Sequence, residues 1–237
     1  MLQACLNGGR AKSQHPAIPC KPEELGADAR AAAGLGAAEF HIHPRGADGR
    51  ESLEPDDVAA ALRAVRASAP GAPIGVSTGA WIRPGGRARQ QTIRAWTVLP
   101  DYVSVNLIEE DAAEIIALAM EKGVAIEAGL WSVSDARRLA ALPAASKCLR
   151  ALIEINEQDV DDGLRAAQAI VKVLDEARLA LPRLLHGADA TQWPLYRESL
   201  RLGLDARIGF EDGLRLPSGE IAADNAALIA AARTLAG

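Results

Sequence analysis

The sequence is poor in aromatic residues, which form 3% of its 237 residues, and it holds only three cysteines. With so few aromatics, stacking of exposed nucleobases on the protein surface is not expected. Cys5, Cys20 and Cys148 are odd in number, far apart and without a Cys-x-x-Cys spacing. This pattern argues against a disulfide framework and against a structural zinc site, and a reducing cytoplasm is the simplest compartment for the chain.

The chain also lacks long apolar runs. No stretch approaches the roughly 18 consecutive apolar residues of a membrane-spanning helix, and no basic segment precedes an apolar run at the N-terminus. The net charge of −5, from 26 basic and 31 acidic residues, argues against a general surface for nucleic acid or acidic membranes. Apolar residues nevertheless form 49% of the chain, enough for the core of one large domain or two small ones.

Short apolar runs alternate with amphipathic segments along the whole chain. Eight of these runs are predicted as strands, and they span residues 2–7, 37–43, 73–78, 102–107, 123–128, 149–155, 182–186 and 205–210. Helical patterns with acidic first turns lie between them, for example from residue 22 onward and over 55–67, 110–122 and 161–178. Because parallel strands need crossover helices, eight such units predict an α/β fold, a (β/α)₈ TIM barrel with a single domain over residues 1–237.

A doubly wound open sheet is the alternative α/β fold. We favour the barrel because the strands number eight, no linker divides the chain, and no predicted strand is followed by the Gly-x-Gly-x-x-Gly of dinucleotide-binding domains. In a barrel the carboxyl ends of the strands and the loops after them form the active-site face. Candidate functional residues are therefore expected at the strand ends.

The second predicted strand ends with a pair of histidines in the run Phe-His-Ile-His-Pro-Arg, residues 40–45. Side chains two residues apart on a strand share a face, so His41 and His43 point to the same side and can hold a metal ion. Pro44 stops the strand directly after them. Two surface histidines, or two hydrogen-bonded core histidines, are the alternative interpretation.

A carboxylate that could complete a metal site follows the last predicted strand. If that strand continues, Arg207 and Glu211 share a face, and Asp212 begins the loop. His41, His43 and Glu211 would supply the three protein ligands of a catalytic zinc site, although the same ligands suit ferrous iron. A helix N-terminal carboxylate or a surface ion pair is the alternative for Glu211.

Further polar residues fall at the other strand ends, and they are Asn7, Ser77, Asn106, Glu127, Glu154 and His186. The hydroxyl and amide groups could instead satisfy nearby backbone groups, and carboxylates inside a barrel often pair with arginines. Glu154 is therefore given no catalytic role, and His186 is either a substrate contact or a hydrogen-bonded histidine beneath the seventh loop. Arg83, Arg87 and Arg89 follow the third strand and could meet phosphates, or they could be an ordinary solvated run of charges.

Four of these motifs together resemble the β-keto acid cleavage enzymes, typified by 3-keto-5-aminohexanoate cleavage enzyme. They are the histidine motif at 40–45, Val-Ser-Thr-Gly at 76–79, Ile-Glu at 126–127, and Arg-Ile-Gly-Phe-Glu-Asp at 207–212. The Asn-Gly-Gly at 7–9 and the Asp-Asn at 224–225 are also similar to the family pattern. The resemblance extends over nearly the whole chain.

The resemblance implies a zinc-dependent (β/α)₈ enzyme that converts a β-keto acid and acetyl-CoA into acetoacetate and a new acyl-CoA. His41, His43 and Glu211 would bind one zinc ion per chain, and Asp212 would be the base with Arg207 as its orienting partner. The residues implied to line the substrate pocket are Asn7, Ser77, Asn106 and Glu127. No protein nucleophile is required, and members of the family are usually homo-oligomers.

Two other functions fit parts of the sequence. An amidohydrolase-like metal-dependent hydrolase also carries a His-x-His pair on a barrel strand, but it normally adds histidines on middle strands, and the fifth and sixth predicted strands have none. A barrel that binds a metal or an acyl ligand without turnover is the non-enzymatic alternative. The presence of Asp212 and Arg207 argues against it.

Overall fold

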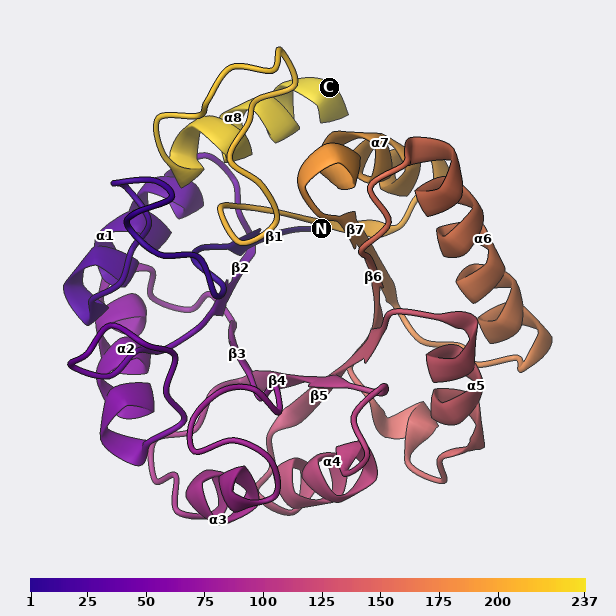
Figure 1. Ribbon diagram of the computed structural model, residues 1–237, viewed down its shortest axis with the longest axis horizontal. Coiled ribbons are helices and arrows are strands. Elements are labelled where there is room, and N and C mark those ends of the chain that lie inside the picture. The colour runs from indigo at the N-terminus through magenta and orange to yellow at the C-terminus, as the bar shows by residue number, and fades with distance from the viewer.

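All eight predicted strands form, each with ends within two residues of the expected ones. The computed structural model describes residues 1–237 and shows the strands as a closed parallel barrel in chain order, with β8 paired to β1 (Figure 1). The strands are β1 Leu2–Cys5, β2 Glu39–Ile42, β3 Ile74–Ser77, β4 Tyr102–Asn106, β5 Ala125–Leu130, β6 Arg150–Ile155, β7 Arg183–Gly187 and β8 Asp205–Ile208. The predicted (β/α)₈ barrel is confirmed.

Eight α-helices form a ring around the strands (Figure 1). They are α1 Pro22–Gly34, α2 Pro55–Ser68, α3 Ala88–Arg94, α4 Ala112–Glu121, α5 Val133–Ala141, α6 Val160–Glu176, α7 Gln192–Leu202 and α8 Asn225–Ala236. In α6 the buried residues Gly163, Ala167, Ile170 and Leu174 recur every three or four positions, which gives one apolar stripe toward the barrel. None of the helices has both the length and the apolar character needed to cross a bilayer.

The strands alternate between apolar residues that face the helices and polar residues that face the barrel interior. On β2, for example, Phe40 and Ile42 belong to the hydrophobic core, whereas Glu39 and His41 bond to groups on other strands inside the barrel. This alternation follows from the two-residue period of a strand. It explains why the interior of this barrel is rich in ionisable groups.

One layer of the interior is a hydrogen-bonded network around Gln3. The amide of Gln3 donates to Glu39 at 2.8 Å, to the Tyr102 hydroxyl at 2.9 Å and to Glu127 at 3.1 Å. Arg150 forms ion pairs with Glu39 and with Glu127, the latter at 2.8 Å. Because buried charges are tolerated only when they are paired, this network fills the interior below the active-site layer.

The last strand ends earlier than the sequence suggested, at Ile208. A Cβ on Gly209 would lie 1.9 Å from the backbone oxygen of Cys5, so the chain passes too close to β1 for any larger residue there. Asn225 then accepts a hydrogen bond from the backbone N–H of Phe210 at 2.6 Å and donates to the backbone oxygen of Leu6 at 2.8 Å. The strand therefore does not continue to Glu211, and a turn carries this residue.

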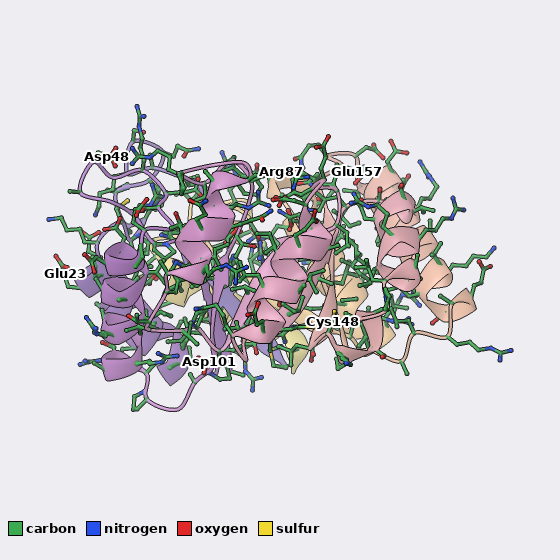
Figure 2. All side chains as sticks on the ribbon, turned by 90° about the horizontal axis from the view of Figure 1, so that it is seen from below. Glu23, Asp48, Arg87, Asp101, Cys148 and Glu157 are labelled. Atoms are coloured by element: carbon green, nitrogen blue, oxygen red, sulfur yellow. The ribbon has the colours of Figure 1, made fainter.

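The two ends of the barrel are seen side-on in Figure 2. Asp48, Arg87 and Glu157, which follow β2, β3 and β6, lie along one edge, whereas Asp101 and Cys148, which precede β4 and β6, lie along the other. The first edge is the carboxyl end of the strands, where active sites of such barrels form.

Asp28 on α1 makes the stability of the fold depend on pH. It is partly buried and accepts a hydrogen bond from Asn225 at 2.6 Å, and burial raises its pKa from 3.8 to about 7. Between these two pKa values the folded chain binds more protons than the unfolded chain, so stability falls as the pH rises. The Asp28→Asn variant is expected to be about 1–2 kcal/mol more stable than the wild type at pH 8 and equal to it near pH 4. Urea unfolding at both pH values measures this, and an equal difference at both would contradict it.

Candidate metal centre and active site

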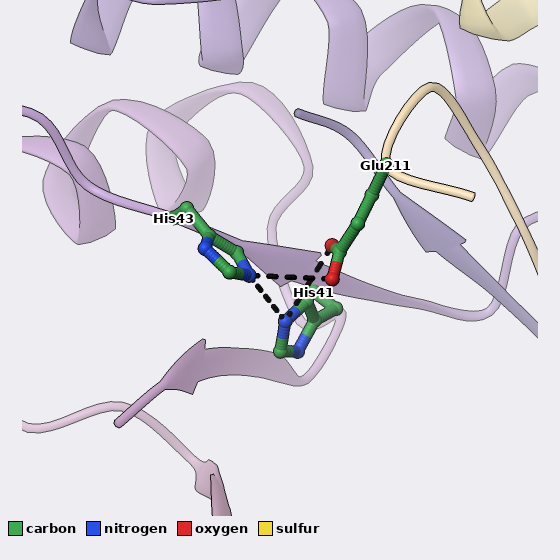
Figure 3. A group of neighbouring side chains, drawn as sticks. All are labelled: His41, His43 and Glu211. Atoms are coloured by element: carbon green, nitrogen blue, oxygen red, sulfur yellow. Dashed lines mark hydrogen bonds and ion pairs between the residues drawn. The ribbon is translucent and has the colours of Figure 1, made fainter. Parts of the chain in front are cut away.

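Three side chains from opposite ends of the sequence converge at the carboxyl end of the barrel (Figure 3). His41 is on β2, His43 follows it, and Glu211 is in the turn after β8. The two Nε2 atoms are 3.1 Å apart. Oε2 of Glu211 lies 3.6 Å from Nε2 of His41, and its Oε1 lies 3.3 Å from Nε2 of His43. Ligands held at zinc bond lengths in a tetrahedral site are about 3.3 Å from one another, so the geometry fits a single zinc ion.

The donor atoms also have the chemistry that a metal site requires. Oε2 of Glu211 is buried and has no hydrogen-bond partner, and such an acceptor is costly unless a cation meets it. The Nδ1 atom of His43 lies 2.5 Å from Glu51, and that of His41 lies 3.3 Å from the Ser104 hydroxyl. These contacts fix both rings so that their Nε2 atoms face the Glu211 carboxylate.

The ionisation of this group follows from its charges. Burial lowers the pKa of His41 to about 4, which leaves the ring neutral. Burial also acts to lower the pKa of His43, but the carboxylates of Glu211 and Glu51 outweigh it and raise the value to about 9. Burial acts to raise the pKa of Glu211, yet Arg207 and the two histidines hold it well below its usual range. Metal binding at neutral pH therefore displaces a proton from His43.

Gly8 gives Glu211 the space it occupies. Its φ is +54°, and an added Cβ would lie 2.4 Å from Cγ of Glu211. In Gly8→Ala we expect about 1–2 kcal/mol of backbone strain and, because Glu211 must move, zinc affinity reduced by at least about tenfold. Gly123→Ala is the matched control, because Gly123 has a φ of +75° and open space around it. Both variants should lose stability on melting, and equal zinc affinity in both would contradict the role of Gly8.

Glu51 is a residue that the sequence analysis missed. It lies on the loop after β2, where a bridge between Arg45 and Glu51 returns the chain to His43. Glu51→Gln keeps the size but removes the charge that orients His43, and we expect zinc affinity to fall about 10–100-fold. Asp48→Asn, on the same loop but turned toward Arg83, should leave the affinity unchanged. Competition titration with a chromophoric chelator measures both, and unaltered affinity in Glu51→Gln would refute the contribution.

Arg207 connects the candidate metal centre to Asp212. Its guanidinium donates to Asp212 at 2.8 and 3.2 Å and to Glu211 at 3.0 Å. The thiol of Cys5 donates to Oδ2 of Asp212 at 3.0 Å, the same oxygen that Nε of Arg207 contacts. Burial acts to raise the pKa of Asp212, but Arg207 lowers it to about 2. Cys5 was expected in the middle of a strand over residues 2–7. The observed strand β1 ends at Cys5, so the thiol lies at the active-site face.

A cavity of about 50 Å³ adjoins the three candidate ligands. Its wall is formed by His41, His43, Ser77, Trp81, Ser104, Asn106, Leu152, Glu154, Arg207 and Glu211. Of the residues predicted to contact substrate, Ser77 and Asn106 lie on this wall. Glu154, which was given no role from the sequence, also lines it.

Asn7 and Glu127 do not line the cavity, which differs from the expectation. Asn7 holds the end of β2, because its amide accepts from the backbone N–H of His43 and donates to the backbone oxygen of His43, both at 2.9 Å. Glu127 lies in the middle of β5, which continues to Leu130, and it is fully buried against Arg150. Both residues therefore support the site from below or beside it.

A larger hollow of about 410 Å³ opens next to Glu51 and Trp81. It is lined by Gly9, Ala11, Arg45, Gly49, Arg50, Glu51, Trp81 and Arg83. Of the three arginines that could meet phosphates or form a solvated run of charges, only Arg83 lines this hollow. Arg87 is exposed elsewhere, and Arg89 is buried and paired with Glu109 at 2.5 Å and Asp111 at 2.8 Å, so its charge is already neutralised.

Solved structures of similar fold confirm the barrel. The apo structure of ObcA has a TM-score of 0.72 at 16% identity and covers 92% of this chain but 61% of its own. The ternary complex of ObcA with C4-CoA adduct and oxalate has a TM-score of 0.73 at 17% identity, with 92% and 63% covered. The 3-hexulose-6-phosphate synthase from Salmonella typhimurium has a TM-score of 0.62 at 15% identity, with 99% and 97% covered. The chain thus spans less than two thirds of the ObcA chains, and these likenesses concern fold alone.

Sequence comparison gives the family. The profile of a family described as beta-keto acid cleavage enzyme matches residues 1–237. A curated relative, the 3-oxoadipate:acetyl-CoA acetyltransferase of Cupriavidus necator, is 30% identical over 239 residues, which cover 92% of this chain and 81% of the relative. The chain therefore belongs to the β-keto acid cleavage enzyme family, a family of enzymes that act on β-keto acids by acyl transfer and carbon–carbon cleavage.

Proposed function

We propose that this enzyme uses one zinc ion to condense a β-keto acid with acetyl-CoA and to cleave the product into acetoacetate and a new acyl-CoA. The observation that supports this most is the convergence of His41, His43 and Glu211 beside the paired Arg207 and Asp212. The candidate metal ligands and the proposed base are thus neighbours, joined by Arg207, which donates to both Glu211 and Asp212. An enolate-forming reaction needs both.

Zinc held by His41, His43 and Glu211 would supply Lewis acidity toward a carbonyl oxygen of the keto acid. The chain's own residues do the rest. Ser77 and Asn106 face the same cavity and can donate hydrogen bonds to the substrate's oxygens. Arg207, whose charge faces the cavity, stabilises the negative charge that develops when the substrate loses a proton.

We propose Asp212 as the base for that proton, with Arg207 as its orienting partner. The electron pair of the broken C–H bond stays on the substrate as an enolate. The enolate attacks the acetyl thioester, and the CoA thiolate that leaves then adds to the original ketone. Cleavage of the bond between that carbon and its neighbour releases acetoacetate and the new acyl-CoA, and the proton returns to acetoacetate.

Acetyl-CoA is proposed to approach through the larger hollow beside Trp81. The Cupriavidus necator relative is named for a keto acid, 3-oxoadipate, and for acetyl-CoA, which supports a keto acid and acetyl-CoA as the substrates here. Arg45, Arg50 and Arg83 line this hollow, and arginines are suited to phosphates. Arg83 is paired with Asp48, and Arg45 is buried and donates to backbone oxygens, so the exposed Arg50 is the best placed of the three to receive an anion.

The alternatives from the sequence are less well supported. An amidohydrolase-like metal centre would draw histidines from middle strands, and neither β5 nor β6 carries one. Family membership disfavours a barrel without turnover. A homo-oligomer in the cytoplasm stays a prediction, and light scattering of the purified protein tests its oligomeric state.

The proposed function is tested by incubating the purified protein with acetyl-CoA and a panel of β-keto acids, 3-oxoadipate among them. Acetoacetate and the acyl-CoA are followed with and without a chelator. We expect product that is lost on chelation and restored by zinc. Hydrolysis of esters or amides without acetyl-CoA would favour the hydrolase instead, and no product from any keto acid would refute the proposal.

A further inference from the structure

The proposed base does not reach the cavity directly. Asp212 is 2% exposed and is absent from the cavity wall, whereas its partner Arg207 lies on that wall. Its Oδ2 atom accepts hydrogen bonds from the Cys5 thiol and from Arg207, and its Oδ1 atom accepts another from Arg207. A group that removes a proton must come within hydrogen-bond reach of it, directly or through an intermediary. Some other group must therefore link Asp212 to the substrate.

His186 on β7 is placed to be part of that link. Its Nδ1 atom lies 3.3 Å from Oδ1 of Asp212, and its Nε2 atom lies 3.6 Å from Oε2 of Glu154. The ring is 3% exposed, and neither nitrogen makes a well-aligned hydrogen bond within the chain. Buried polar groups without partners are rare, and contacts that are long in a ligand-free site shorten when the reaction complex forms.

Glu154 completes the connection on the cavity side. It is the β6 residue that pairs in register with His186 on β7, and its side chain is 20% exposed. On the cavity wall the carboxylates are Glu154 and Glu211, and Glu211 is a candidate metal ligand. Glu154 is therefore the carboxylate free to meet the substrate.

We propose that Glu154 exchanges the proton with the keto acid and that His186 links Glu154 to Asp212, an inference that rests on the proposed function. The C–H bond between the two carbonyl groups breaks, its proton bonds to Glu154, and its electron pair stays on the substrate as the enolate. The proton stays on Glu154, which Nε2 of the His186 imidazolium holds in place while Asp212 pairs with Nδ1. Glu154 then returns the proton to the carbon of acetoacetate, so the enzyme ends unchanged.

The charges around His186 suit a ring that holds a proton. Burial and Arg207 act to lower its pKa, but the Asp212 carboxylate outweighs them and raises the pKa to about 9. Arg207 donates to both oxygens of Asp212, at 3.2 and 2.8 Å, and so neutralises part of its charge. A buried aspartate that stabilises an imidazolium is the arrangement that serine hydrolases use for the same purpose.

The test compares Glu154→Gln, Glu154→Asp and His186→Gln with the wild type in two assays of the zinc-loaded enzyme. The first is exchange of the keto acid's acidic C–H with D₂O in the absence of acetyl-CoA, followed by NMR with the uncatalysed rate subtracted. The second is kcat and KM of the full reaction. Glu176→Gln is the matched control, because Glu176 is an exposed carboxylate on α6.

We expect Glu154→Gln to slow both exchange and kcat by about 10²-fold with KM and zinc content unchanged, and Glu154→Asp to recover part of the loss. His186→Gln should slow both by about 10–10²-fold. A residue with only a structural role would not separate kcat from KM in this way. If His186→Gln fails to fold, the two Glu154 variants alone test the proposal, because Glu154 is partly exposed and its substitution should not prevent folding.

The outcomes separate this inference from the function it rests on. A wild-type rate in Glu154→Gln, with the wild type active on keto acids, would overturn the link through Glu154 and leave the proposed function standing. No exchange and no product from the wild type with any keto acid would overturn both.

Discussion

His43→Ala is expected to abolish stoichiometric zinc binding and to reduce turnover of a β-keto acid with acetyl-CoA on the order of 10³-fold or more. The variant removes one of three candidate ligands and leaves Glu51 without the ring it orients. It also leaves Glu211 with one histidine neighbour instead of two, so the remaining pair cannot hold zinc tightly. Elemental analysis after dialysis and steady-state kinetics measure the two effects.

His15→Ala is the control for this variant, because His15 lies on the loop after β1, its ring contacts Phe210, and it is not one of the candidate ligands. It should keep both zinc and activity. A His43→Ala protein that retained one zinc ion per chain and near wild-type turnover would show that the metal, if any, binds elsewhere.

Asp212→Asn is expected to lower turnover by about 10²–10⁴-fold while zinc binding stays intact. The substitution preserves the shape of the side chain but removes the charge that pairs with Arg207 and faces His186. The three candidate ligands are untouched, so metal content should match the wild type. Steady-state kinetics and elemental analysis of the same preparation give both readings.

Because Asp212 is buried, loss of activity through unfolding must be distinguished from loss of a base. The melting temperature of Asp212→Asn shows whether the fold persists, and Asp175→Asn is a control at an exposed ion pair with Arg183. Turnover of a folded Asp212→Asn protein at the wild-type rate would contradict any role for this carboxylate in proton transfer.

The barrel could be predicted from the sequence because its signal is local and repeated. Each strand is a short apolar run bounded by turn residues, and in each helix the apolar residues recur every three or four positions. The histidine pair was equally visible, since both members lie on one short segment. The ends of strands were less certain: β8 stops at Ile208 because of the close approach of Gly209 to Cys5, a contact between distant parts of the chain.

Residues that act through distant contacts were not visible in the same way. Glu51 reaches His43 because a loop folds back, and no periodic pattern marks such a loop. Glu127 looked like a strand-end residue, but β5 extends to Leu130 and places it lower in the barrel. His186 and Glu154 were noted on their strands, yet only the register of β6 against β7 shows that they face each other and Asp212.

If His41, His43 and Glu211 bind one catalytic metal ion, anomalous scattering from crystals at the zinc edge should locate it between them. We expect one peak within about 2.0–2.2 Å of both Nε2 atoms and a Glu211 oxygen. Elemental analysis of the same protein should give one zinc per chain and not iron. A cavity without a peak in zinc-soaked crystals, or a Glu211 carboxylate turned to solvent, would contradict it.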